Sequence, residues 1–228
     1  MQDVSMRRML ATSVIVAAVM ASMASPVWAV LLKGAEWQMD DTDGQMLDWS
    51  GNNNNGTPTD VDQIGTTYGF NGSTSHVLVP DADSLDPQGK NITLTASVLV
   101  NGQSLNDDSY DVVRKGLVTT KGGDYKMEIQ RGADPTVGKL HCLFKGDRRT
   151  VDKVAPRDIV DGKWYTLQCL KTSTSVVAMV DGRSYTKTGS AGSIANASAV
   201  MVGAKEVTPK PDDMFYGWMD FVSIDIGQ

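Results

Sequence analysis

The chain has 228 residues, with 21 Lys and Arg against 27 Asp and Glu, and its formal net charge is −6. Of the acidic residues, 24 are Asp and only 3 are Glu. Because Asp favours turns and helix caps while Glu tolerates helix interiors, this ratio argues against a helical protein. An acidic chain with few adjacent basic residues is also a poor electrostatic match for nucleic acid, so we expect no nucleic-acid partner.

Residues 1–29 have the pattern of a secretory signal peptide. Arg7-Arg8 forms a positive segment, the apolar run Leu10–Ala24 follows, and Val27-Trp28-Ala29 supplies suitable residues for a cleavage site. We therefore expect a secreted, extracellular protein whose mature domain is 30–228, exported by either the general or the twin-arginine route. The alternative is a retained membrane anchor. The apolar run is short for a membrane span and no second one follows, so we expect no span after signal cleavage.

Two cysteines, Cys142 and Cys169, are present. An even number of cysteines in an exported protein predicts a disulfide. Each lies in a strand-like segment, 139–145 or 163–171, and neighbouring antiparallel strands would bring the two within bonding distance. Such a bond would stabilise the fold by roughly 3–4 kcal/mol. A metal-binding or catalytic thiol is the alternative, but the chain lacks a C-x-x-C spacing.

Short strand-like runs fill the mature chain. Turn dipeptides recur between them, for example at Asn55-Gly56, Asn101-Gly102 and Asp181-Gly182. The predicted strands, rich in Val, Ile, Thr, Tyr and Trp, are 35–39, 67–70, 75–79, 92–100, 110–115, 125–131, 140–144, 164–171, 176–180, 183–187, 199–203 and 214–226. Many short strands without a helical period predict one all-β domain, a two-sheet antiparallel jelly-roll sandwich.

The last predicted strand contains an acidic residue among apolar ones. By the two-residue period of a strand, Asp220 shares a face with Trp218, Val222 and Ile224. A carboxylate in an apolar row is unfavourable unless it is hydrogen-bonded, paired or bound to a cation. Asp220 is therefore either a hydrogen-bonded structural residue or a calcium ligand.

Several motifs occur in a fixed order along the mature chain. They are WQMD at 37–40, LDWSGNNNNG at 47–56, YGFNG at 68–72, HVLVP at 76–80, ITLTASV at 92–98, DGKWY at 161–165, VDG at 180–182 and FYGWMDFV at 215–222. In this order they resemble the landmarks of the laminin G-like group of the concanavalin A-like lectin/glucanase superfamily. The resemblance covers nearly all of the mature chain. It implies a two-sheet jelly roll, often calcium-binding, that serves as a carbohydrate- or protein-binding module.

The resemblance also implies a cation site near the closing strand. In that group an Asp side chain and backbone carbonyls of early strands bind the cation. Asp220 is the corresponding acid here, and Asp40 and the Asn71-Gly72 turn occupy the early segments. Calcium suits this mixture because it accepts about six to eight oxygen ligands in loose geometry. Phe221 stands where the group has a closing Glu, which removes one polar group from this neighbourhood.

The superfamily includes glycosidases, so catalysis must be considered. Retaining glycosidases use two carboxyl groups, and the related enzymes carry theirs on one strand as Glu-x-Asp-x-x-Glu. The nearest candidate, Glu128, lacks both following acids, and the chain has no G-x-S-x-G motif. We expect no catalytic residues and no hydrolysis of β-glucans.

Aromatic side chains can stack on sugar rings when they are exposed. Trp37, Trp164 and Trp218 lie in predicted strands and are expected in the core, which leaves Trp49 and Tyr216 as the candidate ligand-binding residues. For these two, packing beneath a loop is the alternative. Two classes of function fit the sequence: a lectin-like module that binds extracellular glycan or envelope polysaccharide, and an extracellular structural or adhesive protein that binds another protein.

Overall fold

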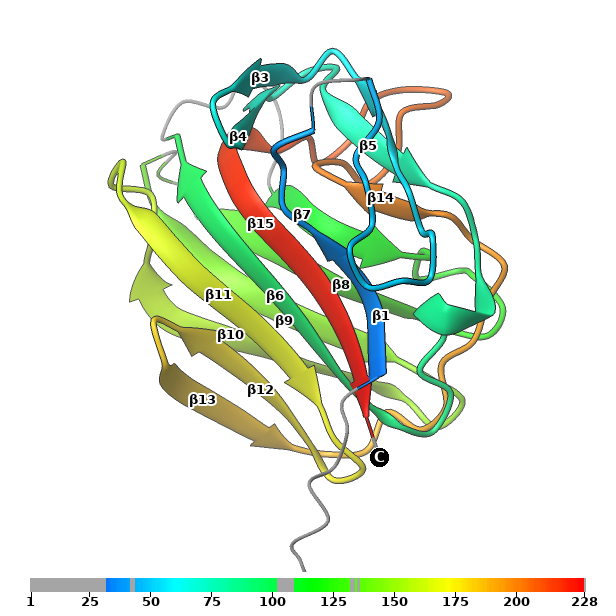
Figure 1. The fold of residues 1–228 in the computed structure, drawn as a ribbon. Coiled ribbons are helices and arrows are strands. Elements are labelled where there is room, and N and C mark those ends of the chain that lie inside the picture. The colour runs from blue at the N-terminus through cyan, green and yellow to red at the C-terminus, as the bar shows by residue number, and fades with distance from the viewer. Residues whose placement is uncertain (1–31, 42–43, 102–108, 132–133, 135, 228) are drawn as a thin grey trace, which may run out of the picture.

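The computed structural model describes residues 32–227, apart from 42–43, 102–108, 132–133 and 135. Within this part of the chain two antiparallel sheets, one of eight strands and one of seven, are stacked face to face (Figure 1). The helical content described is a single 3-10 turn at Asp83–Leu85. The predicted signal peptide, residues 1–29, lies outside the described residues, so its cleavage stays a prediction.

The eight-stranded sheet has its longest strands at the centre. The order is β13 (Arg183–Thr188), β12 (Ser175–Val180), β11 (Trp164–Lys171), β6 (Asn91–Val100), β15 (Tyr216–Gly227), β4 (Thr67–Asn71) and β3 (Asp62–Ile64), with β1 (Leu32–Trp37) paired to β15. Strand β4 pairs with the first part of β15 and β1 with its second part, so both lie on the same side of that strand.

The seven-stranded sheet lies behind it in Figure 1. The order is β10 (Thr150–Asp158), β9 (Gly138–Lys145), β8 (Asp124–Arg131), β7 (Ser109–Lys115), β14 (Val200–Val202), β5 (His76–Val79) and β2 (Thr57–Thr59). Each predicted strand overlaps an observed one, and the expected two-sheet antiparallel sandwich is confirmed.

The sequence analysis missed β2, β3 and β10. The first two are only three residues long. Strand β10 carries charged residues and Pro156, which removes one backbone donor and argues against a strand. The structure accommodates Pro156 because β10 is an edge strand that pairs only with β9. An edge position needs no second set of ladder hydrogen bonds.

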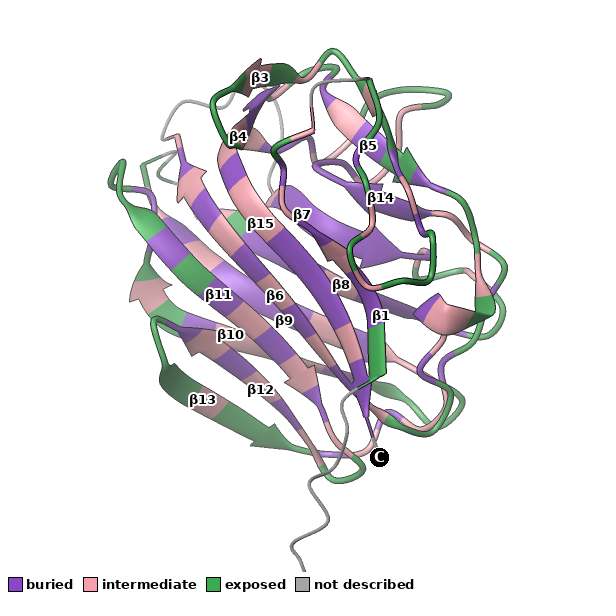
Figure 2. Ribbon diagram, viewed as in Figure 1, coloured by how far each residue is buried: buried purple, intermediate pink, exposed green. Residues whose placement is uncertain are grey.

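The core lies between the two sheets and is formed by alternate residues of their strands. In β6 every second residue from Ile92 to Val100 is fully buried, and the residues between them are half-buried on the outer face (Figure 2). Trp37 on β1 is fully buried, as predicted. Burial of this continuous apolar layer is the dominant stabilising contribution in a sandwich.

The predicted disulfide between Cys142 and Cys169 is confirmed, with 5.3 Å between the Cα atoms. The expected arrangement on neighbouring strands is wrong. Cys142 lies on β9, whose partners are β8 and β10, and Cys169 lies on β11, whose partners are β6 and β12. The bond therefore crosses the core and joins the two sheets, because both side chains point inward from opposite layers.

Strand β15 contains a bulge that changes the interpretation of its pattern. Opposite β6, Met219 pairs with Val98 and Phe221 pairs with Ser97, so Asp220 has no partner in the ladder. One extra residue shifts the alternation of faces. Met219 and Val222 are both buried, and the predicted common face of Trp218, Asp220 and Val222 is therefore wrong.

Candidate functional site

The outer face of the eight-stranded sheet carries an exposed tryptophan that the sequence analysis placed in the core. In β11 every second residue points inward: Tyr165, Leu167 and the disulfide-bonded Cys169. Trp164 belongs to the alternate set of residues, which points outward, and its side chain is 44% exposed. The sequence signal that could have shown this is the alternation of the segment, because the polar residues Thr166 and Gln168 lie on the same side of the strand as Trp164.

A second tryptophan lies on the same outer face. Trp218 precedes the bulge of β15 and is half-buried, so its expected place in the core is also wrong. Its indole covers Gly69 on the neighbouring strand β4, and a Cβ at Gly69 would lie 2.7 Å from the ring atom Cζ3. The indole can lie against the sheet only because residue 69 has no side chain.

The two tryptophans belong to one row across the sheet. Trp164 is the register partner of Leu99 on β6, and Leu99 is the partner of Trp218 on β15. We call Trp164, Leu99 and Trp218 the indole row. Neighbouring strands are about 4.8 Å apart, so the two tryptophans stand roughly 10 Å apart with Leu99 between them.

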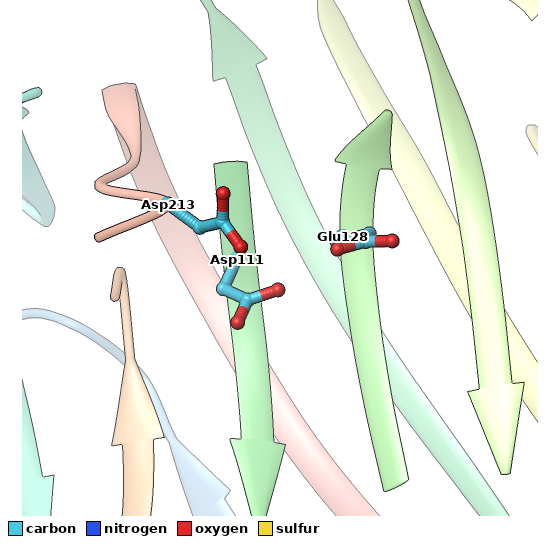
Figure 3. Close-up of side chains that lie close together, drawn as sticks. All are labelled: Asp111, Glu128 and Asp213. Atoms are coloured by element: carbon cyan, nitrogen blue, oxygen red, sulfur yellow. The ribbon is translucent and has the colours of Figure 1, made fainter. Parts of the chain in front are cut away.

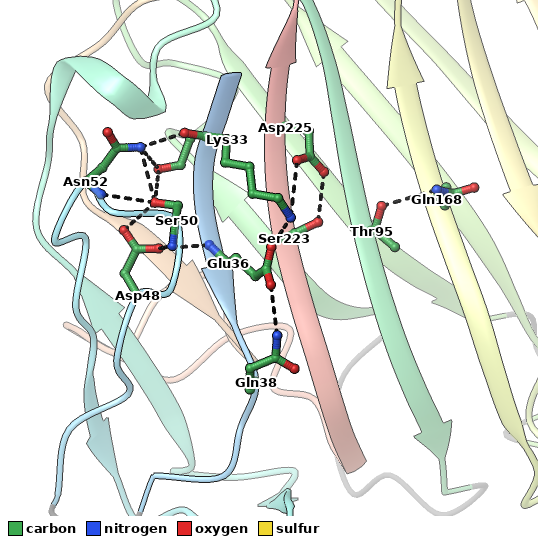
Figure 4. A network of polar contacts seen from close by, with 11 residues as sticks. Lys33, Glu36, Gln38, Asp48, Ser50, Asn52, Thr95, Gln168, Ser223 and Asp225 are labelled. Carbon is green, nitrogen blue, oxygen red and sulfur yellow. Dashed lines mark hydrogen bonds and ion pairs between the residues drawn. The ribbon is translucent and has the colours of Figure 1, made fainter. Parts of the chain in front are cut away.

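A parallel polar row lies on the same outer face. Gln168, Thr95, Ser223 and Glu36 are successive register partners on β11, β6, β15 and β1. The Gln168 amide donates a hydrogen bond to Thr95 Oγ1 at 3.3 Å. Figure 4 shows these side chains side by side on the four strands. We call this set the polar row; it carries amide, hydroxyl and carboxylate groups on the same outer face, four residues along the strands and so about 13 Å from the indole row.

The loop after β1 supports one end of the polar row. Asp48 is the centre of this loop and accepts hydrogen bonds from the backbone N–H groups of Glu36, Ser50 and Asn54, each at 2.9 Å. Figure 4 shows the first two of these bonds. Glu36 Oε1 also accepts a hydrogen bond from the Gln38 amide at 2.9 Å. Because its carboxylate is occupied by backbone donors, Asp48 fixes the loop rather than facing a ligand.

The two predicted ligand-binding aromatics lie at different places. Trp49 is 63% exposed, and its backbone N–H donates to the carbonyl of Glu36 at 2.8 Å, which places it at the β1 end of the polar row. Tyr216 is half-buried against the core and beside Gly72. A role of either residue in ligand binding stays a prediction, and Trp49 has the exposure that stacking needs.

The predicted calcium ligands are spread over the bulge, an early segment and a turn. Asp220 accepts a long hydrogen bond of 3.5 Å from Thr66 Oγ1, and Asp40 is exposed. The Asn71 side-chain oxygen accepts hydrogen bonds from the backbone N–H groups of residues 73, 74 and 75, at 2.9 to 3.1 Å. The Gly72 N–H donates to the Phe215 carbonyl at 3.0 Å. Asn71 therefore holds its own turn, and calcium at this place stays a prediction.

Three carboxylates come together on the outer face of the other sheet. Asp111 on β7 and Glu128 on β8 are register partners, and Asp213 precedes β15 (Figure 3). One carboxylate oxygen from each lies within 4.8 Å of the others. We call these residues the carboxylate cluster. The sequence analysis dismissed Glu128 because no acid follows it on its own strand; the neighbouring acids come from other segments.

The environment moves the pKa values of the cluster apart. Burial raises the pKa of Asp111 to about 7, although Arg114 NH1 lies 2.5 Å from Asp111 Oδ2. Burial also acts to raise the pKa of Glu128, but a 2.5 Å hydrogen bond with His141 Nδ1 and the ion pair with Lys126 outweigh it and lower the pKa to about 2. One carboxyl can therefore hold a proton near neutral pH while its neighbour stays ionised.

Whether the carboxylate cluster could hydrolyse a sugar depends on whether a substrate can reach it. Separated pKa values would suit an acid and a nucleophile of a glycosidase. However, Asp111 is 0% exposed and Glu128 is 4% exposed. A sugar could not place its glycosidic bond between these groups without displacing neighbouring side chains. Absence of hydrolysis stays our prediction.

No protein-family model matches the sequence, and no curated protein matches it either. Among solved structures, the binding domain of botulinum neurotoxin DC in complex with SialylT has a TM-score of 0.59 at 12% identity, over 85% of this chain and 47% of its own. The binding domain of Paraclostridial Mosquitocidal Protein 1 has a TM-score of 0.61 at 18% identity, and the match covers 85% of this chain and 49% of that domain. Domains LG4-5 of the mouse laminin alpha1 chain have a TM-score of 0.54 at 16% identity, and the match covers 73% of this chain and 45% of theirs.

These likenesses establish the fold. The chain spans about half the length of the structures that it matches, and identities this low carry no function across. The chain is a β-sandwich of the kind found in toxin binding domains and laminin LG domains, and the laminin structure supports the jelly-roll type. Among the described helices, none has the length and apolar character to cross a membrane.

Proposed function

We propose that the protein is a secreted, non-catalytic module that binds carbohydrate through the outer face of the eight-stranded sheet. The observation that carries the proposal is the exposed indole row on the same outer face as the polar row. Sugar rings present C–H groups on their faces and hydroxyl groups at their edges. An indole face, which is electron-rich, attracts the C–H groups, and amides and carboxylates bind the hydroxyls.

The flat arrangement of the two rows indicates an extended glycan rather than a single sugar in a pocket. Trp164 and Trp218 stand two strands apart, with Leu99 continuing the apolar surface between them. A chain of sugars lying across the strands would cover the indole row and place its hydroxyls near Thr166 and Ser97, the neighbouring register pair on this face. A longer glycan that also runs along the strands would reach Gln168 and Thr95. Trp49, beyond Glu36, would extend the contact.

The comparisons and the disulfide support this proposal in part. Two structures of the neurotoxin DC binding domain were solved, one in complex with SialylT and one with rat synaptotagmin II. The neurotoxin DC binding domain, of which this chain covers about half, was thus solved with two different binding partners. The disulfide between Cys142 and Cys169 fits an oxidising, extracellular compartment. The alternative function is an extracellular adhesive protein whose partner is another protein.

The test is a glycan array with the purified protein, followed by affinity measurements on the best glycan. Trp164→Ala should weaken binding about tenfold, equivalent to about 1.4 kcal/mol, because an exposed stacking surface is lost. Gly69→Ala should also weaken binding, since the new Cβ must displace the Trp218 indole. Val118→Ala is the matched control: Val118 is 66% exposed but lies between β7 and β8 of the other sheet.

Two results would contradict the proposal. One is an array without reproducible binding, which would favour the protein-binding alternative. The other is glycan binding that is unchanged in both Trp164→Ala and Gly69→Ala, which would move the site away from the indole row. Melting temperatures of all variants show whether the fold is retained.

A further inference from the structure

The carboxylate cluster gathers three acidic groups in a place with little water. Asp111 and Glu128 are buried, and Asp213 is half-buried. Like charges brought this close repel each other strongly at low dielectric, so a compensating group is required. The basic or titratable side chains that face the cluster are Arg114 on β7, Lys126 on β8, His141 on β9 and Lys205 in the segment before β15.

These partners leave two carboxylates incompletely compensated. Arg114 takes Asp111 Oδ2, and both Glu128 oxygens are engaged by Lys126 and His141. Asp111 Oδ1 is buried and accepts no hydrogen bond within the described residues. Lys205 lies 2.5 Å from Asp212 but 3.4 Å from Asp213 Oδ2. A buried carboxylate oxygen without a donor is rare in folded proteins, and a bound ion is one of the groups that satisfies it.

The backbone holds Asp213 against Asp111. The Asp111 N–H donates to the Asp213 carbonyl at 2.9 Å, which fixes the two residues side by side. Asp213 has φ of +47°, in the left-handed region that residues with a Cβ seldom adopt. Such a conformation persists where the surrounding structure enforces it, often at a binding site. The fold thus places the Asp213 carboxylate next to a buried carboxylate instead of turning it to solvent.

We propose that Asp111, Glu128 and Asp213 form a binding site for a divalent cation, with calcium as the favoured ion. All three ligands are carboxylate oxygens, which hard cations prefer, and no His or Cys belongs to the set. Asp111 Oδ1 is the buried oxygen left to take the ion, whereas coordination by Glu128 requires Lys126 or His141 to release one of its oxygens. This site is on the opposite sheet from Asp220 and does not depend on the glycan proposal.

The experiment is a thermal melt of the full protein, first stripped with chelator and checked for residual metal. Calcium at a hundredfold excess over its dissociation constant should raise the melting temperature by roughly 5–10 °C. Asp111→Asn should abolish this rise, and so should Asp213→Asn. Asp213 is half-buried and does not pair with Arg114, so Asp213→Asn tests the site without disturbing the Arg114 ion pair.

Two controls give the experiment its specificity. Asp152→Asn removes a carboxylate that contacts His141 on the same sheet but lies outside the cluster. Asp220→Asn removes the ligand predicted from the sequence. The proposal requires that both keep the calcium-dependent rise. It is overturned if millimolar calcium, magnesium and manganese all leave the stripped protein unchanged, or if the rise survives Asp111→Asn and Asp213→Asn, or if Asp220→Asn alone removes it.

Discussion

Single residues decide the chemistry of both outer faces. On the eight-stranded sheet, Gly69 gives Trp218 a place to lie against the backbone, since any side chain there would meet the indole. On the seven-stranded sheet, the complete burial of Asp111 converts an ordinary acid into a group that titrates near neutrality. Both effects combine the chemistry of the residue itself with what the neighbouring strand places beside it.

The cluster should give the folding stability an unusual pH dependence. Asp111 has a folded-state pKa of about 7 against an ordinary 3.8, so between these values the folded protein holds a proton that the unfolded chain has released. Stability contributed by this proton is lost as the pH rises from about 4 to about 7. Glu128 acts in the opposite direction: its pKa of about 2 against 4.5 means that its contribution is lost as the pH falls from 4.5 toward 2.

We therefore predict that Asp111→Asn removes the decline in stability between about pH 4 and pH 7. The measurement is the free energy of unfolding from urea melts over pH 3–8, with chelator present so that no metal competes with the proton. Asp152→Asn serves as the control from the same sheet. Parallel pH profiles for the wild type and Asp111→Asn would show that Asp111 carries no proton in the folded state.

At the scale of elements, strand positions are largely determined by local sequence, and outer-face chemistry is not. The turn dipeptides and β-branched runs predict most strands within a few residues, because both depend on neighbours in sequence. The edge strand β10 and the bulge at Asp220 depend on which strand lies alongside. A bulge reverses the inward parity, which is why Trp218 was assigned to the core.

The candidate sites show the same limit. The carboxylate cluster joins residues more than 80 positions apart through the pairing of β7 with β8 and a contact with the segment before β15. The hairpin of β7 and β8 is local, but a single sequence carries no sign that Asp213, more than 80 positions further along the chain, lies against it. The direction of Trp164, by contrast, was available from the sequence, since it shares one side of the strand with the polar residues Thr166 and Gln168.

The disulfide is a covalent link between β9 and β11, which belong to different sheets. We predict that Cys142→Ala/Cys169→Ala lowers the free energy of unfolding by roughly 3 kcal/mol, because the unfolded chain gains the freedom of a loop of 27 residues. Urea melts of the double variant measure this loss, and the wild type melted under reducing conditions should give the same value. Alkylation of the unreduced, denatured wild type at Cys142 and Cys169 would refute the bond.

At the scale of the whole molecule, the sandwich separates two surfaces of different chemistry. The indole row lies on the outer face of one sheet and the carboxylate cluster on the outer face of the other. Packed sheets are about 10 Å apart, and a close-packed core of side chains fills the space between them. The core in turn is clamped by the Cys142–Cys169 bond. This rigid arrangement supports each surface without connecting their binding groups.

The last prediction is that the two surfaces act independently. Sites more than about 7–10 Å apart with no shared partners usually contribute additively to free energies. Trp164→Ala should therefore weaken glycan binding and leave the calcium-dependent rise in melting temperature intact, while Asp111→Asn should do the reverse. The double variant Trp164→Ala/Asp111→Asn should show both losses, each equal to that of its single variant. Glycan affinity measured with calcium and with chelator completes the cycle: a dependence of glycan binding on calcium that Asp111→Asn removes would show that the core transmits binding from one face to the other.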